Sequence, residues 1–86
     1  MIKYIYTIYD KVAQQATGNL MITDKEAALL RELKTANLGE LVEKNLDDFD
    51  LYCIGELNTE IPQAIAYETA KMVIHLEVLK HGSKDN

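Results

Sequence analysis

The segment at residues 2–9 limits the fold most, because it predicts a strand that is apolar on both faces. Its sequence, IKYIYTIY, is rich in the β-branched and aromatic residues that favour strands. Strand alternation divides these residues into two sets, Ile2, Tyr4, Tyr6 and Ile8 on one face and Lys3, Ile5, Thr7 and Tyr9 on the other. Two apolar faces suit a central strand better than an edge strand.

The main helix is predicted by a local pattern at residues 23–26, Thr-Asp-Lys-Glu. This is the form of a capping box, in which Thr23 accepts a hydrogen bond from the Glu26 amide and the Glu26 side chain reaches back. The helix should run over about residues 24–36. Its inward face would carry Ala27, Leu29, Leu30, Leu33 and Ala36.

The segments that flank this helix have weaker patterns. Residues 10–19, DKVAQQATGN, break the strand alternation and are typical of a loop, and residues 20–22 form a short extended piece. After the helix, the helical spacing of Leu38, Leu41 and Val42 predicts a short second helix over residues 39–44.

The second half of the chain supplies the remaining strands. Residues 51–57 predict a strand, 58–60 a tight reversal, and 61–68 a returning strand, which together make a hairpin. Pro62 has no amide donor, so the returning strand should lie at an edge or begin irregularly. Residues 69–80 fit both periods, because apolar residues alternate over 72–76 while others share one helical face. We favour a strand over 72–76.

These elements predict a single α+β domain over residues 1–80, followed by a polar C-terminal tail at 81–86. An antiparallel sheet of three to four strands would be packed by the main helix and the short second helix. No apolar stretch approaches the roughly 20 residues needed to cross a bilayer, so we expect no membrane partner. Cys53 is the one cysteine and excludes an internal disulfide, which favours a reducing compartment.

Charge is unevenly distributed along the chain. The net charge is −5, and residues 38–68 carry eight acidic residues against Lys44 alone. Nucleic acids are bound chiefly through neutralisation of phosphates by Lys and Arg. We therefore expect the middle third of the chain to be repelled from nucleic acid, so that any such contact comes from elsewhere.

No catalytic or metal motif is present in the sequence. Cys53 lies in an apolar strand, where a free cysteine usually behaves as a small buried hydrophobe, although His75 could approach it across a sheet. The acidic run at residues 47–50 fails the EF-hand register, because Tyr52 and Cys53 would occupy positions 5 and 6 of the loop. We expect no enzymatic activity, no metal and no cofactor.

Tyrosines and lysines near the N-terminus give a candidate surface for single-stranded DNA. Tyr4 and Tyr6 share one strand face about 7 Å apart, and paired aromatic residues on a sheet can stack bases. The phosphate contacts would come from Lys3, Lys11 and Lys25. The competing interpretation, which we favour, is that both rings pack beneath the face of Leu29 and Leu33, since aromatic residues dominate small cores.

Two blocks of sequence carry a resemblance to a known family. They are IYTIYDKVA at residues 5–13 and DDFDLYCIGEL at residues 47–57. In content, order and separation they resemble the small nonstructural protein of gokushovirus-type microviruses, which are single-stranded-DNA phages. The resemblance implies a protein absent from the mature virion that acts in the host cytoplasm in genome replication or packaging, with single-stranded DNA as a proposed ligand.

Three hypotheses on partners stay open at this point. The first is weak binding of single-stranded DNA without sequence preference. The second is an acidic interaction module that docks on a basic nucleic-acid-handling protein, such as a phage or host replication protein, through Glu40, Glu43, Asp47, Asp48 and Asp50. The third is a homo-oligomer joined along an exposed strand edge.

Overall fold

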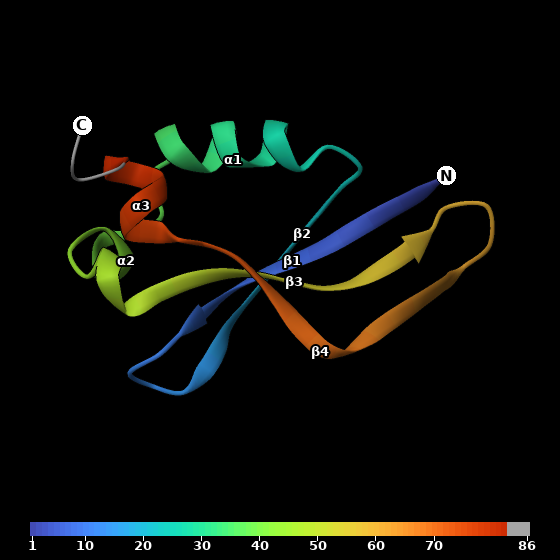
Figure 1. Cartoon of the computed structure of the whole chain (residues 1–86), viewed down its shortest axis with the longest axis horizontal. Helices are drawn as coiled ribbons and strands as arrows, with labels where there is room; N and C mark the ends of the chain where they lie inside the picture. The colour runs from blue at the N-terminus through green and yellow to red at the C-terminus, as the bar shows by residue number, and fades with distance from the viewer. Residues whose placement is uncertain (83–86) are drawn as a thin grey trace.

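Four strands form one antiparallel sheet in the order β2-β1-β3-β4. The computed structural model describes residues 1–82, and its strands are β1 (Ile2–Asp10), β2 (Gln15–Thr23), β3 (Phe49–Asn58) and β4 (Gln63–His75) (Figure 1). The central position predicted for the first strand is confirmed, because β1 pairs with β2 on one side and β3 on the other. The strand that follows Pro62 is an edge strand, also as predicted.

The helices gather on one side of the sheet (Figure 1). They are α1 (Glu26–Thr35), α2 (Glu40–Glu43) and α3 (Leu76–His81), with a 3-10 turn, η1 (Leu46–Asp48), before β3. The α+β class, the four-stranded sheet and the main helix agree with the sequence-based prediction, whereas α3 was not predicted. None of the helices within residues 1–82 is long and apolar enough to cross a bilayer.

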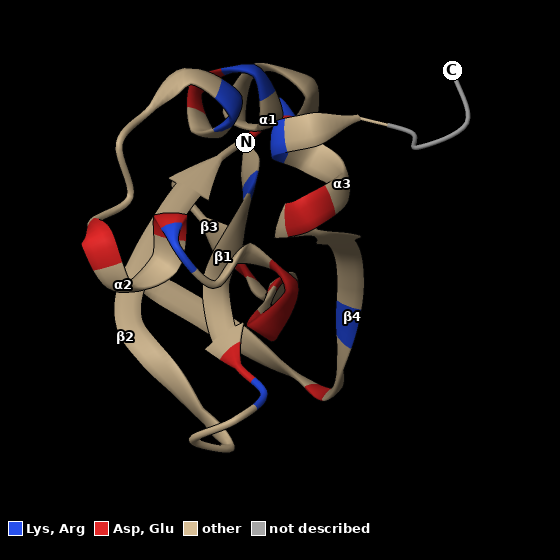
Figure 2. Ribbon diagram, turned by 90° about the vertical axis from the view of Figure 1, so that its left-hand side faces the viewer, with Lys and Arg blue, Asp and Glu red and all other residues tan. Residues whose placement is uncertain are grey.

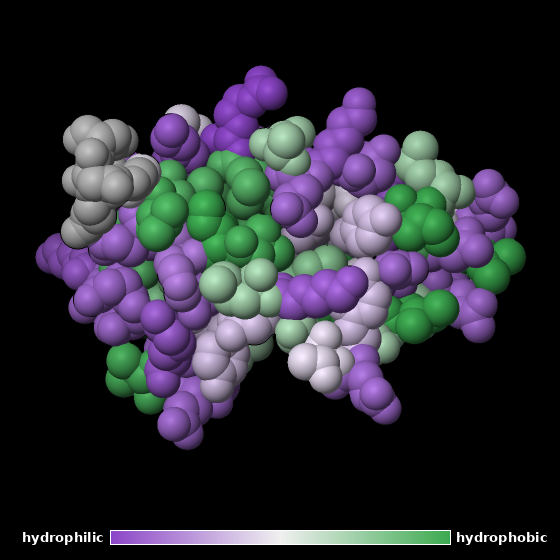
Figure 3. All heavy atoms as spheres, in the orientation of Figure 1, coloured by the Kyte–Doolittle hydropathy of each residue, from purple (hydrophilic) through white to green (hydrophobic). Residues whose placement is uncertain are grey.

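The core lies between the helices and one face of the sheet. Tyr6 and Ile8 of β1 and three residues of β3, Phe49, Leu51 and Cys53, share one core cluster with Leu29 and Leu33 of α1. Two further helical residues, Leu76 and Leu79, close the core from α3. Figure 3 shows apolar atoms gathered where α1 and α3 meet. Of the inward face predicted for the main helix, Leu29 and Leu33 are buried, whereas Ala27 and Ala36 are exposed.

The predicted loop at residues 10–19 is wrong, because β2 already begins at Gln15. The Asp10 carboxylate accepts hydrogen bonds from the amides of Val12 and Ala13 at 2.9 and 3.1 Å, which tightens the reversal. Residues such as Gly18 and Asn19 are poor strand formers, and the ladder with β1 overrides their propensity. Gly18, at a φ of 96°, lies where the pairing register of β1 and β2 shifts.

The predicted capping box is also wrong. Lys25 occupies the N-cap of α1, and no side chain caps the helix there. Thr23 instead ends β2, and its hydroxyl accepts from the Lys25 amide at 3.0 Å in a local turn. The Glu26 carboxylate accepts from the Tyr6 hydroxyl at 2.9 Å. A tertiary hydrogen bond to β1 therefore takes the side chain that the capping box needed.

Residues 69–80, whose sequence fits both strand and helix periodicity, form the end of a strand followed by a helix. The two strands predicted over 61–68 and 72–76 are one long strand, β4, in which residues 67–70 fall outside the regular ladder with β3. Figure 1 shows the resulting bend. Leu76, predicted as the last strand residue, begins α3. His81 belongs to this helix rather than to the predicted tail, and residues 83–86 lie outside the described part of the chain.

Candidate functional site

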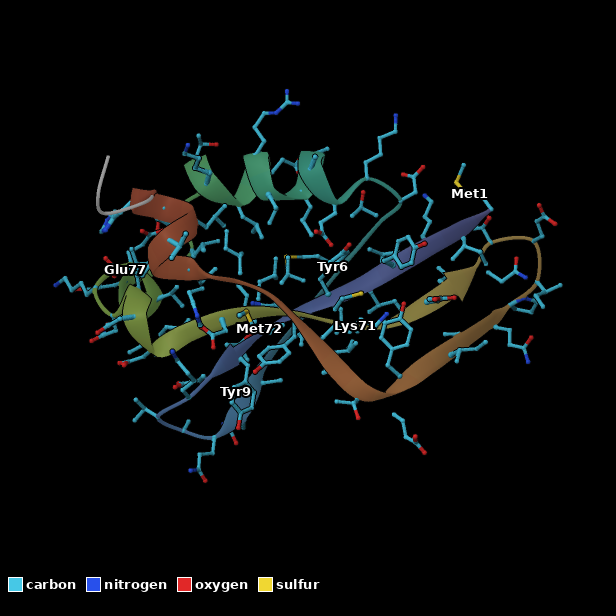
Figure 4. All side chains as sticks on the ribbon, viewed as in Figure 1. Met1, Tyr6, Tyr9, Lys71, Met72 and Glu77 are labelled. Atoms are coloured by element: carbon cyan, nitrogen blue, oxygen red, sulfur yellow. The ribbon has the colours of Figure 1, made fainter. Side chains whose placement is uncertain are left out.

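The two faces of β1 separate the residues predicted to bind DNA. Tyr4 and Tyr6 point to the side of the helices, whereas strand alternation places Lys3 on the other side. Figure 4 shows Tyr6 on the side of α1 and Tyr9 on the opposite side. Lys25 is at the N-cap of α1. The structure therefore does not bring the predicted tyrosines and lysines together into one surface.

Tyr6 is a core residue and offers no ring face to a base. Its side chain is 1% exposed, and its hydroxyl donates to the Glu26 carboxylate. Burial, followed by this hydrogen bond, raises the pKa of the Tyr6 hydroxyl above its ordinary range. The interpretation that Tyr6 packs beneath Leu29 and Leu33 agrees with the core. Tyr4 lies at the margin of the core and is 36% exposed.

A different pair of tyrosines lies on the opposite face of the sheet, here called the open face and defined by Thr7, Tyr9 and Tyr52. The rings of Tyr9 and Tyr52, from the two central strands, are 5.8 Å apart and nearly perpendicular. They border a hollow of about 390 Å3 that is mostly apolar and is lined by Thr7, Tyr9, Ala16, Tyr52, Ile54 and Ala70. Ladder partners on this face include Leu20 and Met72, which are 61% and 45% exposed. The open face thus presents aromatic and apolar side chains to solvent.

Basic groups lie beside these tyrosines. His75 is the ladder partner of Asp50, and its Nδ1 is 2.7 Å from the Asp50 carboxylate. The ammonium of Lys11 is 3.5 Å from the same carboxylate. Asp50 is only 4% exposed, whereas about half of the His75 side chain is exposed. Lys3 lies on the same face toward the other end of β1. A buried acid therefore positions two exposed basic groups next to the aromatic pair.

The charge around the open face is low in acids. At the paired positions of the four strands on this face, Asp50 is the acidic residue, and it is buried between His75 and Lys11. In the part of β4 outside the ladder, alternation places the exposed Glu68 on the same side as Ala70. The edge strand β2 carries no charged residue (Figure 2). A phosphate chain crossing this face would meet fewer carboxylates than the net charge of the protein suggests.

The predicted acidic surface is largely occupied by contacts within the chain. Glu40 pairs with Lys44 at 2.7 Å, and Asp50 is buried. Glu43 accepts from the Leu38 amide and pairs with Lys80, both at 2.9 Å, and these partners lower its pKa. Within residues 1–82 the carboxylates of Asp47 and Asp48 make no hydrogen bond or ion pair.

Cys53 and His75 do not form a pair. The ladder places Cys53 opposite Lys71 and His75 opposite Asp50, so the two side chains lie on different faces of the sheet. The Cys53 thiol is buried and donates to the Gly55 carbonyl at 3.9 Å. In residues 1–82 no group of three or more His, Cys, Asp or Glu side chains is placed to hold a metal ion.

Sequence reasoning missed Tyr9, Tyr52 and His75 as neighbours. Alternation along residues 2–9 already separates Tyr9 from Tyr6, which was the available signal for a second aromatic face. The partner strand and its register decide which residue lies beside Tyr9, and neither could be inferred from one segment. The ladder aligns Tyr9 with Asp50 and Thr7 with Tyr52.

Comparison with known protein families gives a match over most of the chain. A family model described as Phage ORF5 protein matches residues 3–79. This range covers β2, β3, β4, all of β1 except Ile2, and most of α3. No curated protein and no solved structure shows a significant match.

Proposed function

Because the chain belongs to the Phage ORF5 protein family, we propose that this phage accessory protein binds single-stranded DNA weakly, without sequence preference, on the open face of its sheet. We further propose that it serves the synthesis or packaging of the viral strand in small phages of the gokushovirus type. It would act in the host cytoplasm and without catalysis of its own.

The observation that carries the proposal is the Tyr9–Tyr52 pair beside an apolar hollow. Exposed aromatic rings on a sheet are a common platform for unpaired bases, and each stacked base contributes about 1–3 kcal/mol. The hollow of about 390 Å3 gives room for part of a base next to the rings. Stacking of this kind is tolerant of sequence, since every base has an aromatic face.

Electrostatics limits the expected affinity. The basic groups at the paired and flanking positions of the open face are Lys3, Lys11 and His75. The charge of Lys11 is partly neutralised by its ion pair with Asp50. We expect two to four phosphate contacts, which corresponds to a log–log salt slope of about −1.5 to −3 for a single strand. Binding should therefore be micromolar or weaker at physiological salt, with little affinity for duplex.

The test is a salt titration of a fluorescently labelled oligothymidylate followed by anisotropy. Tyr52→Leu should weaken binding, whereas Tyr4→Leu is the matched control because Tyr4 is on the helix side of the sheet. An equal loss in the two variants, or a slope steeper than about −5, would contradict the assignment to the open face.

A second candidate function rests on the carboxylates of Asp47 and Asp48 in η1, which pair with no group in the described part of the chain. These could steer the protein to a basic replication protein of phage or host, because complementary charge accelerates encounter. This alternative predicts no DNA binding at any salt concentration. It also predicts recovery of such a protein with the wild-type chain but not with an Asp47→Asn, Asp48→Asn double variant.

A further inference from the structure

A pocket of about 510 Å3 lies on the helix side of the sheet, where β1 and β4 face the start of α1. We call it the Tyr67 pocket; its polar and aromatic lining comes from Tyr4, Tyr6, Asp24, Glu26, Tyr67 and Lys71. We propose that this pocket binds a guanidinium group, as carried by the arginine side chain of a partner protein.

The pocket already holds a cation from the protein itself. The ammonium of Lys71 lies 4.7 Å from the centre of the Tyr67 ring, within the range of a cation–π contact. Tyr67 belongs to the part of β4 that lies outside the regular ladder with β3, and its side chain lines the pocket. Tyr4, 36% exposed, provides a second aromatic residue at the pocket. Figure 4 labels Lys71 and Tyr6, which both line this pocket.

Carboxylates surround this aromatic lining. Glu26 and Glu56 each use one oxygen to accept a tyrosine hydroxyl at 2.9 Å, Glu26 from Tyr6 and Glu56 from Tyr67. Within residues 1–82 the second oxygen of each group makes no hydrogen bond or ion pair. Asp24 adds a third carboxylate, exposed and unpaired within the same residues. Asp24 and Glu26 line the pocket, whereas Glu56 contacts the Tyr67 hydroxyl from outside the lining. Against the two lining acids the pocket has one basic group, Lys71.

The hydroxyl contacts fix the carboxylates in place. The pKa values of Tyr6 and Tyr67 are both raised above the ordinary range, by burial first and by the hydrogen bond to the carboxylate second. The two hydroxyls therefore stay protonated at neutral pH and act as donors. Of their acceptors, Glu26 lines the pocket, and its second oxygen has no donor within residues 1–82; Glu56 holds the Tyr67 hydroxyl from outside the lining.

The combination of flat aromatic faces and fixed acceptors favours guanidinium over ammonium. A guanidinium is planar, stacks on aromatic rings and presents its N–H groups as a fork that matches carboxylate oxygens. An ammonium is a compact, strongly hydrated charge that gains less from stacking. Phosphate would be repelled by Asp24 and Glu26, so we expect this pocket and the open face to bind ligands of opposite charge.

The proposal is tested by NMR titration of the 15N-labelled full chain with N-acetyl-arginine amide, N-acetyl-lysine amide and spermidine. Saturable shifts should appear at Asp24, Tyr67 and Lys71 with the arginine compound, which should bind at least about threefold more tightly than the lysine compound. A tri-arginine peptide that binds more tightly than the single residue supports a protein as the source. Equal binding supports a small guanidinium compound, and both results support the guanidinium assignment.

Variants distinguish binding in the pocket from attraction of the cation by the net negative charge of the protein. Tyr67→Leu and Asp24→Asn should each weaken arginine binding about two- to fivefold, whereas Lys71→Met should strengthen it by a similar factor because it removes the competing cation. Glu32→Gln makes the same change in net charge as Asp24→Asn but lies outside the pocket, on the exposed side of α1, and should leave binding unchanged. The proposal is overturned by equal shifts with all three ligands, by equal effects of Asp24→Asn and Glu32→Gln, or by the absence of saturable shifts.

Discussion

The carboxylate of Asp50 is buried beneath the exposed imidazole of His75, with Oδ1 and Nδ1 2.7 Å apart. The two residues are ladder partners on β3 and β4, so the contact ties an edge strand to a central one. Lys11 approaches the same oxygen at 3.5 Å. A buried carboxylate needs such partners, because an unpaired charge in the protein interior is costly.

We expect His75→Ala to lower the free energy of unfolding by about 1–3 kcal/mol, since the buried Asp50 loses its shortest hydrogen bond. The matched control is His81→Ala, which removes the pair with Glu77 on the surface of α3. That pair spans four residues of one helix and should contribute about 0.5 kcal/mol or less. Urea unfolding at neutral pH measures both, and equal losses would contradict a supporting role for Asp50–His75.

Gly55 is expected to tolerate no side chain. A Cβ at this position would clash with the Ile65 carbonyl oxygen, because β3 and β4 approach each other closely before β4 leaves the ladder. Gly55→Ala must therefore displace backbone, and we expect a loss of about 1–3 kcal/mol or more. Urea unfolding and the amide spectrum of residues 64–66 measure the effect; an unchanged midpoint would show that the strands separate at little cost.

Several features of the fold were predictable because the signal lies within a single segment. The two apolar faces of residues 2–9 required a central strand, and β1 is central. Pro62 required an edge, and β4 is at the edge. The helical spacing of Leu29 and Leu33 placed both in the core. Each inference rests on backbone geometry and local periodicity, which tertiary contacts did not reverse.

Other features depend on residues far apart in the sequence. The strand β2 contains poor strand formers, and it forms because its backbone pairs with β1. The Glu26 side chain does not close a capping box, because its carboxylate accepts a hydrogen bond from the Tyr6 hydroxyl instead. The candidate surface for DNA follows the same logic. Tyr9 was visible as a residue on the other face from Tyr6, but its contact with Tyr52 arises from the pairing of β1 with β3.

The Tyr6–Glu26 hydrogen bond predicts a loss of stability at alkaline pH. The pKa of Tyr6 is raised in the folded state by burial and by Glu26. The neutral hydroxyl therefore contributes stability fully below the ordinary tyrosine pKa of about 10, and this contribution is lost as the pH rises through the folded-state value. Tyr6→Phe should cost about 0.5–1.5 kcal/mol at pH 7, through the lost hydrogen bond.

Above pH 10 the Tyr6→Phe variant should lose less stability than the wild type, because one of the titrating groups is gone. Urea unfolding between pH 7 and 11, with tyrosinate absorbance recorded in parallel, measures this difference. Tyr4→Phe is the control, since Tyr4 is at the margin of the core. Parallel pH profiles for wild type and Tyr6→Phe would show that ionisation of Tyr6 is not linked to unfolding.

Glu43 predicts the opposite dependence at acidic pH. Its pKa is lowered in the folded state, first by the hydrogen bond from the Leu38 amide and then by Lys80. A lowered pKa contributes stability above the unfolded-state value of about 4.3, and that stability is lost as the pH falls through the folded-state value. The urea midpoint of the wild type should therefore fall more steeply than that of Glu43→Gln between pH 5 and 3.

Glu40→Gln removes a neighbouring carboxylate whose Lys44 pair is exposed, and it should keep the wild-type slope. If the two variants behave alike, the link between α2 and α3 through Lys80 does not stabilise the fold.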